Sequence, residues 1–266
     1  FAPAYAALAD AYADLEFWGI NFEDTYLQVK AAASKAIELD PELPEAHATM
    51  GLVHARDRRW DQAREAFERS VAINPNLSRT RTAYAHWYLF QTGQLARALQ
   101  ELRTALSHDP LSLDIRRVMA YVQVSAGDYD AALENCNYVL KVDPNFPLIG
   151  LVRSRALLMK GQTAEGVAIL EAMPPNRAPE LGYAYAVTGR RAEAEALANA
   201  AANVPLTQAI IYAGLGDYSR AFAALERGAA AGDPKIGGVL TYPEMVALRQ
   251  DPRYGALRRR IGLEGA

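Results

Sequence analysis

The sequence predicts an all-α fold, a solenoid of helix pairs that repeat every 34 or 35 residues. Apolar residues recur at helical spacing, as in Ala33, Ala36 and Ile37. Four segments close on an acidic or amide residue followed by proline, and these prolines are 34, 35 and 34 residues apart: Asp40-Pro41, Asn74-Pro75, Asp109-Pro110 and Asp143-Pro144. A fixed period near 34 with two helices per unit indicates a stack of about seven units with atypical ends.

The composition limits the class of protein. The 266 residues are 51% hydrophobic and 22% charged, which is typical of an ordered chain. The net charge of −3 gives no general attraction to nucleic acid or to anionic membranes. The single cysteine, Cys136, cannot form an intrachain disulfide, and the sequence has no uninterrupted run of 18 apolar residues. We therefore expect a cytoplasmic protein without a membrane segment.

The repeats divide the chain into four segments. The predicted order is a first repeat with a long loop between its helices, then regular repeats, then weaker repeats, then a C-terminal cap, over residues 1–43, 44–175, 176–228 and 229–266. The loop of the first segment is rich in aromatic residues: Phe17, Trp18 and Phe22. Exposed aromatic side chains are costly unless covered, so this loop either folds back as a cap or contacts a neighbouring domain or a second copy of the chain.

Within the regular segment, Gly51 and Ala63 are the small residues that allow the two helices of one repeat to approach closely. A larger side chain at such a crossing overpacks it. The third repeat is one residue longer than its neighbours, and we place the extra residue in the turn at 91–94. At the other end, Leu257, Ile261 and Leu263 alternate with arginines at helical spacing. That pattern favours a docked amphipathic cap, with binding of nucleic acid or an acidic partner as the alternative.

Together these features resemble the tetratricopeptide repeat. The pattern is carried by the small residue Gly51, an alanine twelve positions later (Ala63), the turn Gly127-Asp128-Tyr129 with Ala132, and the closing proline. The resemblance implies a right-handed superhelix of antiparallel helix pairs, with the first helix of each pair lining a concave face. It implies a protein or peptide partner rather than a reaction.

A narrower resemblance concerns three short motifs. Residues 4–12 (AYAALADAY), 109–113 (DPLSL) and 248–254 (LRQDPRY) are similar to the C-terminal repeat regions of bacterial adenylate or guanylate cyclases and of winged-helix transcriptional regulators. This resemblance implies a sensory or regulatory module attached to an output domain. Since the sequence begins at Phe1 rather than Met, we expect a longer parent protein. The alternative is a free-standing adaptor or assembly factor.

The family geometry implies which residues line the groove. They are arginines set among aliphatic and aromatic residues: Leu52, Arg56, Arg79, Thr82, His86, Phe90, Arg117, Tyr121, Leu151, Arg155 and Met159. Such a lining suits a peptide or helix with an apolar stripe and one or two carboxylates. Alternatively, the arginines pair with Asp114 and Glu45, and the groove is only solvated.

The sequence offers no catalytic motif. It contains no phosphate-binding glycine loop, nucleophile elbow or zinc-protease signature, so we expect neither an enzyme nor a cofactor. His47 and His54 lie seven residues apart, but they fill positions that hold packed aromatic residues in other repeats. Packing is therefore favoured over metal binding, with pH sensing as a further alternative. Cys136 is expected to be an inert core thiol.

Overall fold

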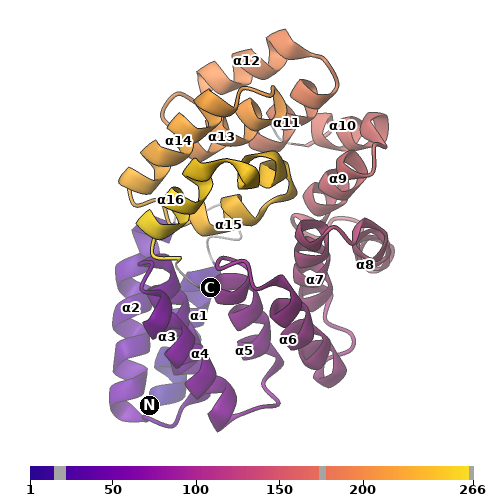
Figure 1. Cartoon of the computed structure of the whole chain (residues 1–266). Helices are drawn as coiled ribbons and strands as arrows, with labels where there is room; N and C mark the ends of the chain where they lie inside the picture. Colours follow the sequence, from indigo (N-terminus) through magenta and orange to yellow (C-terminus); the bar gives the residue numbers. More distant parts are fainter. Residues whose placement is uncertain (15–21, 174–177, 264–266) are drawn as a thin grey trace. The chain divides into compact units, whose positions relative to one another are not determined.

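A computed structural model describes residues 1–14, 22–173 and 178–263. The described chain is all-helical, and its helices form sequential antiparallel pairs, as predicted (Figure 1). It divides into two compact units, residues 1–90 with 96–115 and residues 91–95 with 116–266. None of the described helices is long and apolar enough to cross a membrane.

Unit 1 begins with two regular helix pairs and most of a third. Its elements are α1 (Ala2–Asp14), α2 (Phe22–Leu39), α3 (Pro44–Arg56), α4 (Trp60–Ile73), α5 (Ser78–Tyr84), the π-helix η2 (Ala85–Leu89) and α6 (Leu95–His108). Phe17 and Trp18 of the predicted aromatic loop lie outside the described residues. Phe22 begins α2, but its side chain is not among those described.

Unit 2 continues the pairs and ends in three short helices. Its elements are α7 (Leu113–Ala126), α8 (Tyr129–Val142), α9 (Ile149–Met159), α10 (Thr163–Glu171), α11 (Ala178–Val187), α12 (Arg191–Ala200), α13 (Pro205–Gly214), α14 (Tyr218–Ala230), α15 (Ile236–Thr241), the 3₁₀-helix η3 (Pro243–Gln250) and α16 (Pro252–Arg260). Residues 113–115 of α7 and all of α6 except Leu95 belong to unit 1.

At three of the four prolines, the residue before the proline explains why one repeat ends and the next begins there. The Asp40 carboxylate accepts a hydrogen bond from the backbone N–H of Glu42 at 3.0 Å. Asn74 and Asp143 make the same contact two residues ahead, at 3.1 and 2.9 Å. Such a side chain fixes a turn, while the following proline cannot continue the preceding helix. The punctuation seen in the sequence is therefore a repeated turn.

From the second repeat to the seventh, the turn inside the repeat has a left-handed backbone position. Gly93 and Gly127 both have a φ of 84° there, and Gly161 has 80°. In the second repeat this position is held by Arg58, with a φ of 56°. Only glycine adopts such torsions without steric cost, so Arg58 is a strained member of an otherwise glycine series.

The predicted close crossing in the second repeat is present. A Cβ atom added to Gly51 would lie 2.8 Å from the ring of Phe67, and Ala63 is completely buried. Phe67 also stacks on Tyr84 of the next repeat, with ring centroids 5.3 Å apart. The small residues therefore allow one aromatic side chain to pack within its own repeat and against the next.

The prediction for the extra residue of the third repeat was wrong in its position. The structure accommodates it in the π-helix η2, where the N–H of Phe90 donates to the carbonyl of Ala85 at 2.9 Å, one residue farther back than in an α-helix. The physical reason is burial: Tyr88, Leu89 and Phe90 are three consecutive large core residues. The wide helical turn thus lies where three consecutive large side chains are buried.

Candidate partner-binding groove

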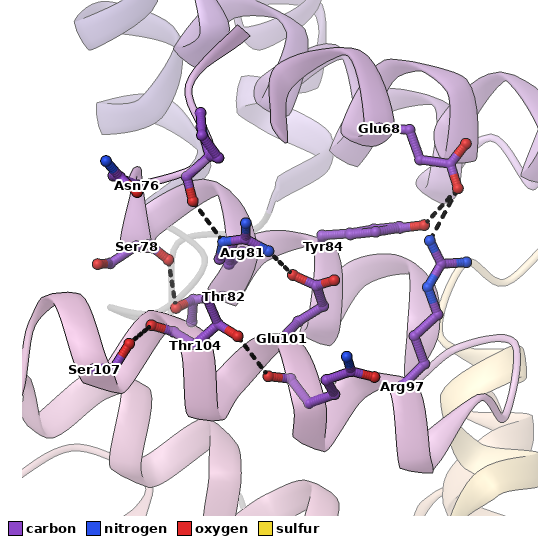
Figure 2. A network of polar contacts seen from close by, with 12 residues as sticks. Glu68, Asn76, Ser78, Arg81, Thr82, Tyr84, Arg97, Glu101, Thr104 and Ser107 are labelled. Carbon is purple, nitrogen blue, oxygen red and sulfur yellow. Dashed lines mark hydrogen bonds and ion pairs between the residues drawn. The ribbon is translucent and has the colours of Figure 1, made fainter. Parts of the chain in front are cut away.

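Polar contacts join the helices of unit 1 before any partner binds (Figure 2). Glu68 of α4 accepts from the Tyr84 hydroxyl at 3.2 Å and from the Arg97 guanidinium at 3.0 Å. Arg81 donates to the carbonyl of Pro75 at 2.7 Å and pairs with Glu101 of α6. These hydrogen bonds and ion pairs hold α4, α5 and α6 together, so we assign these side chains a structural role.

The predicted groove residues of unit 1 differ in accessibility. Leu52, Thr82 and Phe90 are buried, and Phe90 is entirely so because the π-helix turns it into the core. Arg56 and His86 are half-buried, whereas the Arg79 side chain is 55% exposed. A partner at the surface of unit 1 would therefore meet Arg56, Arg79 and His86 rather than the three buried residues.

Asp10 connects the first helices of the first three repeats, α1, α3 and α5. Its carboxylate accepts from the Thr49 hydroxyl of α3 at 2.7 Å and forms an ion pair with Arg79 of α5 at 3.1 Å. Asp10 itself lies on α1 and is 23% exposed. One polar cluster thus joins the helices α1, α3 and α5; Thr49 is buried, whereas Arg79 and part of Asp10 are solvated.

Arg56 belongs to a neighbouring cluster of cations and one tyrosine. Its guanidinium carbon lies 5.8 Å from the ring centre of Tyr26, and the Lys30 ammonium lies 6.0 Å from the same centre. The Tyr26 hydroxyl donates to Asp57. Burial and this contact with Asp57 raise the pKa of Tyr26 to about 12. The tyrosine therefore remains a neutral donor at physiological pH.

The predicted groove residues of unit 2 lie much deeper. Arg117 and Arg155 are 4% and 3% exposed. Leu151 packs against the core around Leu158 and Leu170, and Met159 is half-buried. The structure therefore places the two arginines inside the unit rather than on an open surface.

A polar cluster surrounds Arg155. Its Nε donates to Glu244 at 2.7 Å, and its Nη2 lies 3.4 Å from Glu180. Its guanidinium carbon lies 4.2 Å from the ring centre of Tyr242. The Tyr121 hydroxyl donates to the Tyr242 hydroxyl at 2.6 Å, and the two rings meet edge to face. Side chains of the first helices α7 and α9 thus contact the segment that begins at Tyr242, and Glu180 of α11 contacts Arg155 in the same cluster.

The electrostatics of this cluster follow from its burial. Burial alone would lower the pKa of Arg155, but Glu244, Tyr242 and Glu180 together raise it above its ordinary value. Burial raises the pKa of both tyrosines as well. At neutral pH the cluster therefore combines a cation with two neutral hydroxyl groups beside Glu180 and Glu244.

Sequence reasoning missed the residues that complete the cluster: Glu180, Tyr242 and Glu244. The sequence placed Tyr242 and Glu244 only within the C-terminal cap, residues 229–266. One signal was available in the sequence, because Glu244 is the only charged residue between Ile236 and Leu248. A charge in such a setting is nearly always paired.

His47, His54 and Cys136 lie in hydrogen-bonded or partly to fully buried positions. The ring Nε2 of His47 donates to the carbonyl of Pro41 at 2.8 Å. Burial lowers the pKa of His54, and burial raises the pKa of Cys136 to about 12. Over residues 1–14, 22–173 and 178–263, no group of three His, Cys, Asp or Glu side chains is placed to hold a metal ion.

Comparison with known families identifies the repeat. Tetratricopeptide repeat profiles match residues 44–77, 89–133 and 123–188, which together make up half of the chain. The transcriptional regulator HilA of Salmonella typhimurium (strain LT2) is 32% identical over 107 residues, which are 40% of this chain and 19% of that protein. HilA of Salmonella typhi matches equally. The matched part thus spans about a fifth of the length of these curated relatives.

Solved structures share the fold at low sequence identity. A tetratricopeptide repeat protein from Parabacteroides merdae has a TM-score of 0.61 at 16% identity, covering 90% of this chain and 99% of that one. PilW, described as a widely conserved type IV pilus biogenesis factor, has a TM-score of 0.55 at 17% identity, covering 86% and 92%. Pseudomonas aeruginosa pilF has a TM-score of 0.52 at 18% identity, covering 92% and 100%. These likenesses establish the fold alone.

Proposed function

We propose that this chain, which belongs to the tetratricopeptide repeat family, is the regulatory part of a larger cytoplasmic signalling protein of a bacterium. The predicted family is confirmed by profiles over half of the chain. Proteins of this family are protein–protein interaction modules, so the ligand is a protein or peptide and no reaction is expected of the chain itself. The partial similarity to a transcriptional regulator supports the regulatory role.

The observation that carries the proposal is the charged face of α1, α3 and α5. Arg79 is 55% exposed although it is paired with Asp10 at 3.1 Å. A solvated ion pair of this kind contributes only about 0.2–1 kcal/mol to folding, so it can be exchanged for a partner's carboxylate at little cost. Arg56 of α3 and His86 of η2 are half-buried polar residues of the same first helices. An acidic peptide or helix is the partner that this face fits best.

Capture of partners from a lysate of the source bacterium tests the site. Arg79→Ala combined with Arg56→Ala should reduce recovery of specific partners roughly two- to tenfold, as expected for the loss of two surface charges. Arg69→Ala is the matched control, because Arg69 is an exposed arginine of α4 paired with Glu42. Equal recovery by the double variant and by the control would contradict the site, provided that thermal unfolding is unchanged in both.

The regulatory role has a separate test in the coding region that contains these 266 residues. A DNA-binding, cyclase or kinase domain in the same reading frame would support it, and the double variant should then change the output of that domain. A gene that encodes only the repeats would favour the alternative, a free-standing adaptor or assembly factor. Likeness in fold to PilW and pilF is compatible with that alternative.

A second copy of the chain is a further candidate partner. We propose that the loop containing Phe17, Trp18 and Phe22 forms this contact, because exposed aromatic residues need a cover. Trp18→Ala should then lower the mass measured by light scattering. An unchanged mass would favour the loop as a cap of its own repeat.

A further inference from the structure

One short segment near the C-terminus occupies the positions where unit 2 would hold a peptide. Tyr242 reaches Tyr121 on α7, and Glu244 reaches Arg155 on α9. Glu180 on α11 contacts the same guanidinium. A tetratricopeptide repeat protein lines its groove with these first helices, so the segment 242–250 directly engages the first helices of two successive repeats, and the third contributes Glu180 through Arg155.

The segment also has the form of a bound peptide. Tyr242 is extended, with φ −61° and ψ 148°, and Pro243 begins a 3₁₀-helix of eight residues. Two side chains anchor it: an aromatic ring that lies against a guanidinium, and a carboxylate that accepts from that guanidinium. Ring and carboxylate are two residues apart. This is recognition by a few anchors of a short linear motif.

We propose that residues 242–250 are an internal ligand of unit 2, and that a partner segment with tyrosine-proline-glutamate chemistry displaces them from Tyr121 and Arg155. This inference rests on the proposed protein-binding function and specifies a second site for it. Binding and release of the internal segment would then report the presence of the partner.

Met245 and Leu248 of the segment are buried, so release must expose them, but two other features favour exchange of the segment for a partner. Glu244 is 94% buried, and within the described residues its Oε2 atom has no hydrogen-bond partner. A buried unsatisfied oxygen costs about 1–3 kcal/mol, so the internal ligand is imperfectly held. In addition, 3₁₀ hydrogen bonds have poorer geometry than α-helical ones, and Val246 on the outer side of η3 is 57% exposed. A partner that supplies its own donor to the carboxylate would bind better.

The test uses the whole chain and a fluorescein-labelled synthetic peptide of residues 240–250, with fluorescence anisotropy as the measurement. Glu244→Gln in the chain weakens the internal competitor, so this variant should bind the peptide at least about tenfold more tightly than the wild-type chain. Glu134→Gln, an exposed glutamate of the same unit, should bind like the wild type. Glu244→Gln in the peptide should weaken its binding to the Glu244→Gln chain about tenfold.

A purely structural cap gives different results. Glu244→Gln would then lower the unfolding temperature without any gain in peptide affinity, and the peptide would not depend on its own glutamate. Either result overturns the proposal. Neither result would affect the proposed function, because that function is tested separately with Arg56 and Arg79 of unit 1.

Hydrogen exchange of the wild-type chain tests displacement of the segment even if the Glu244→Gln variant fails to fold. Excess unlabelled peptide should accelerate exchange in residues 243–250 while α13 stays protected, because only the internal ligand is released. No acceleration, or equal acceleration in α13, would contradict displacement.

Discussion

The two units use arginines on equivalent first helices in opposite ways. In unit 1, the Arg79–Asp10 pair joins side chains that are 55% and 23% exposed. In unit 2, the Arg155–Glu244 pair joins side chains that are 3% and 2% exposed. Water competes with the first pair and is excluded from the second. The same kind of ion pair is therefore an exchangeable surface contact in one unit and part of the interior in the other.

The difference shows that position in a repeat does not determine what an arginine does. A surface pair contributes little to stability because its charges are equally well solvated when it opens. A buried pair adds little over an apolar core but costs a great deal when one partner is lost, because the remaining charge stays buried. The comparison therefore predicts unequal effects of equal substitutions.

The largest expected effect is that of Arg155→Ala. It should lower the free energy of unfolding by about 3–5 kcal/mol, since Glu244 and Glu180 are left without their cation. Arg79→Ala should cost less than about 1 kcal/mol. Urea denaturation followed by circular dichroism measures both. Similar losses for the two variants would remove the distinction between the units.

A middle-sized effect is expected for the tyrosine pair of unit 2. Tyr121→Phe and Tyr242→Phe each remove one hydroxyl of the 2.6 Å contact. The double-mutant cycle should give a coupling free energy of about 0.5–1.5 kcal/mol. Tyr84→Phe is the comparison in unit 1, where the hydroxyl donates to the partly solvated Glu68, and a smaller loss is expected. Additive effects at Tyr121 and Tyr242 would mean that the hydrogen bond contributes nothing.

The smallest effect concerns acid pH and should be confined to unit 1, which contains all four histidines of the sequence. Burial lowers the pKa of His54 below 6.5, and Arg59 lowers it further. The folded state thus binds this proton less tightly than the unfolded state, so stability is complete above pH 6.5 and falls as the pH drops below it. His54→Gln should flatten the dependence. Tryptophan fluorescence follows unit 1 alone, because Trp18, Trp60 and Trp87 all belong to it.

The repeat architecture was predictable because its signals are local. The turn that Asp40 or Asn74 forms with the following proline involves only a few neighbouring residues. The small residue Gly51 is likewise recognised by its position, seven residues after the start of its helix. Each unit repeats these signals at a nearly constant spacing. Period and helix pairing can therefore be inferred without knowing any long-range contact.

The interior of the groove was not predictable in the same way. Arg155 contacts a residue 89 positions away, and Tyr121 contacts one 121 positions away. No local pattern encodes which segment returns to a helix at that distance. Phe90 illustrates a second limit of prediction from sequence. The extra residue of the third repeat could be recognised from the spacing, but its accommodation in the π-helix, where Phe90 is buried, could not.

That π-helix has a consequence for how the chain tolerates change. Removing one residue from an α-helix rotates everything beyond it by about 100° and usually moves core side chains to the surface. Removing one residue between Ala85 and Leu89 would instead convert the wide turn into a regular one and restore the spacing of the other repeats. A one-residue deletion that would prevent folding in α3 or α7 is therefore expected to be compatible with folding in the π-helix.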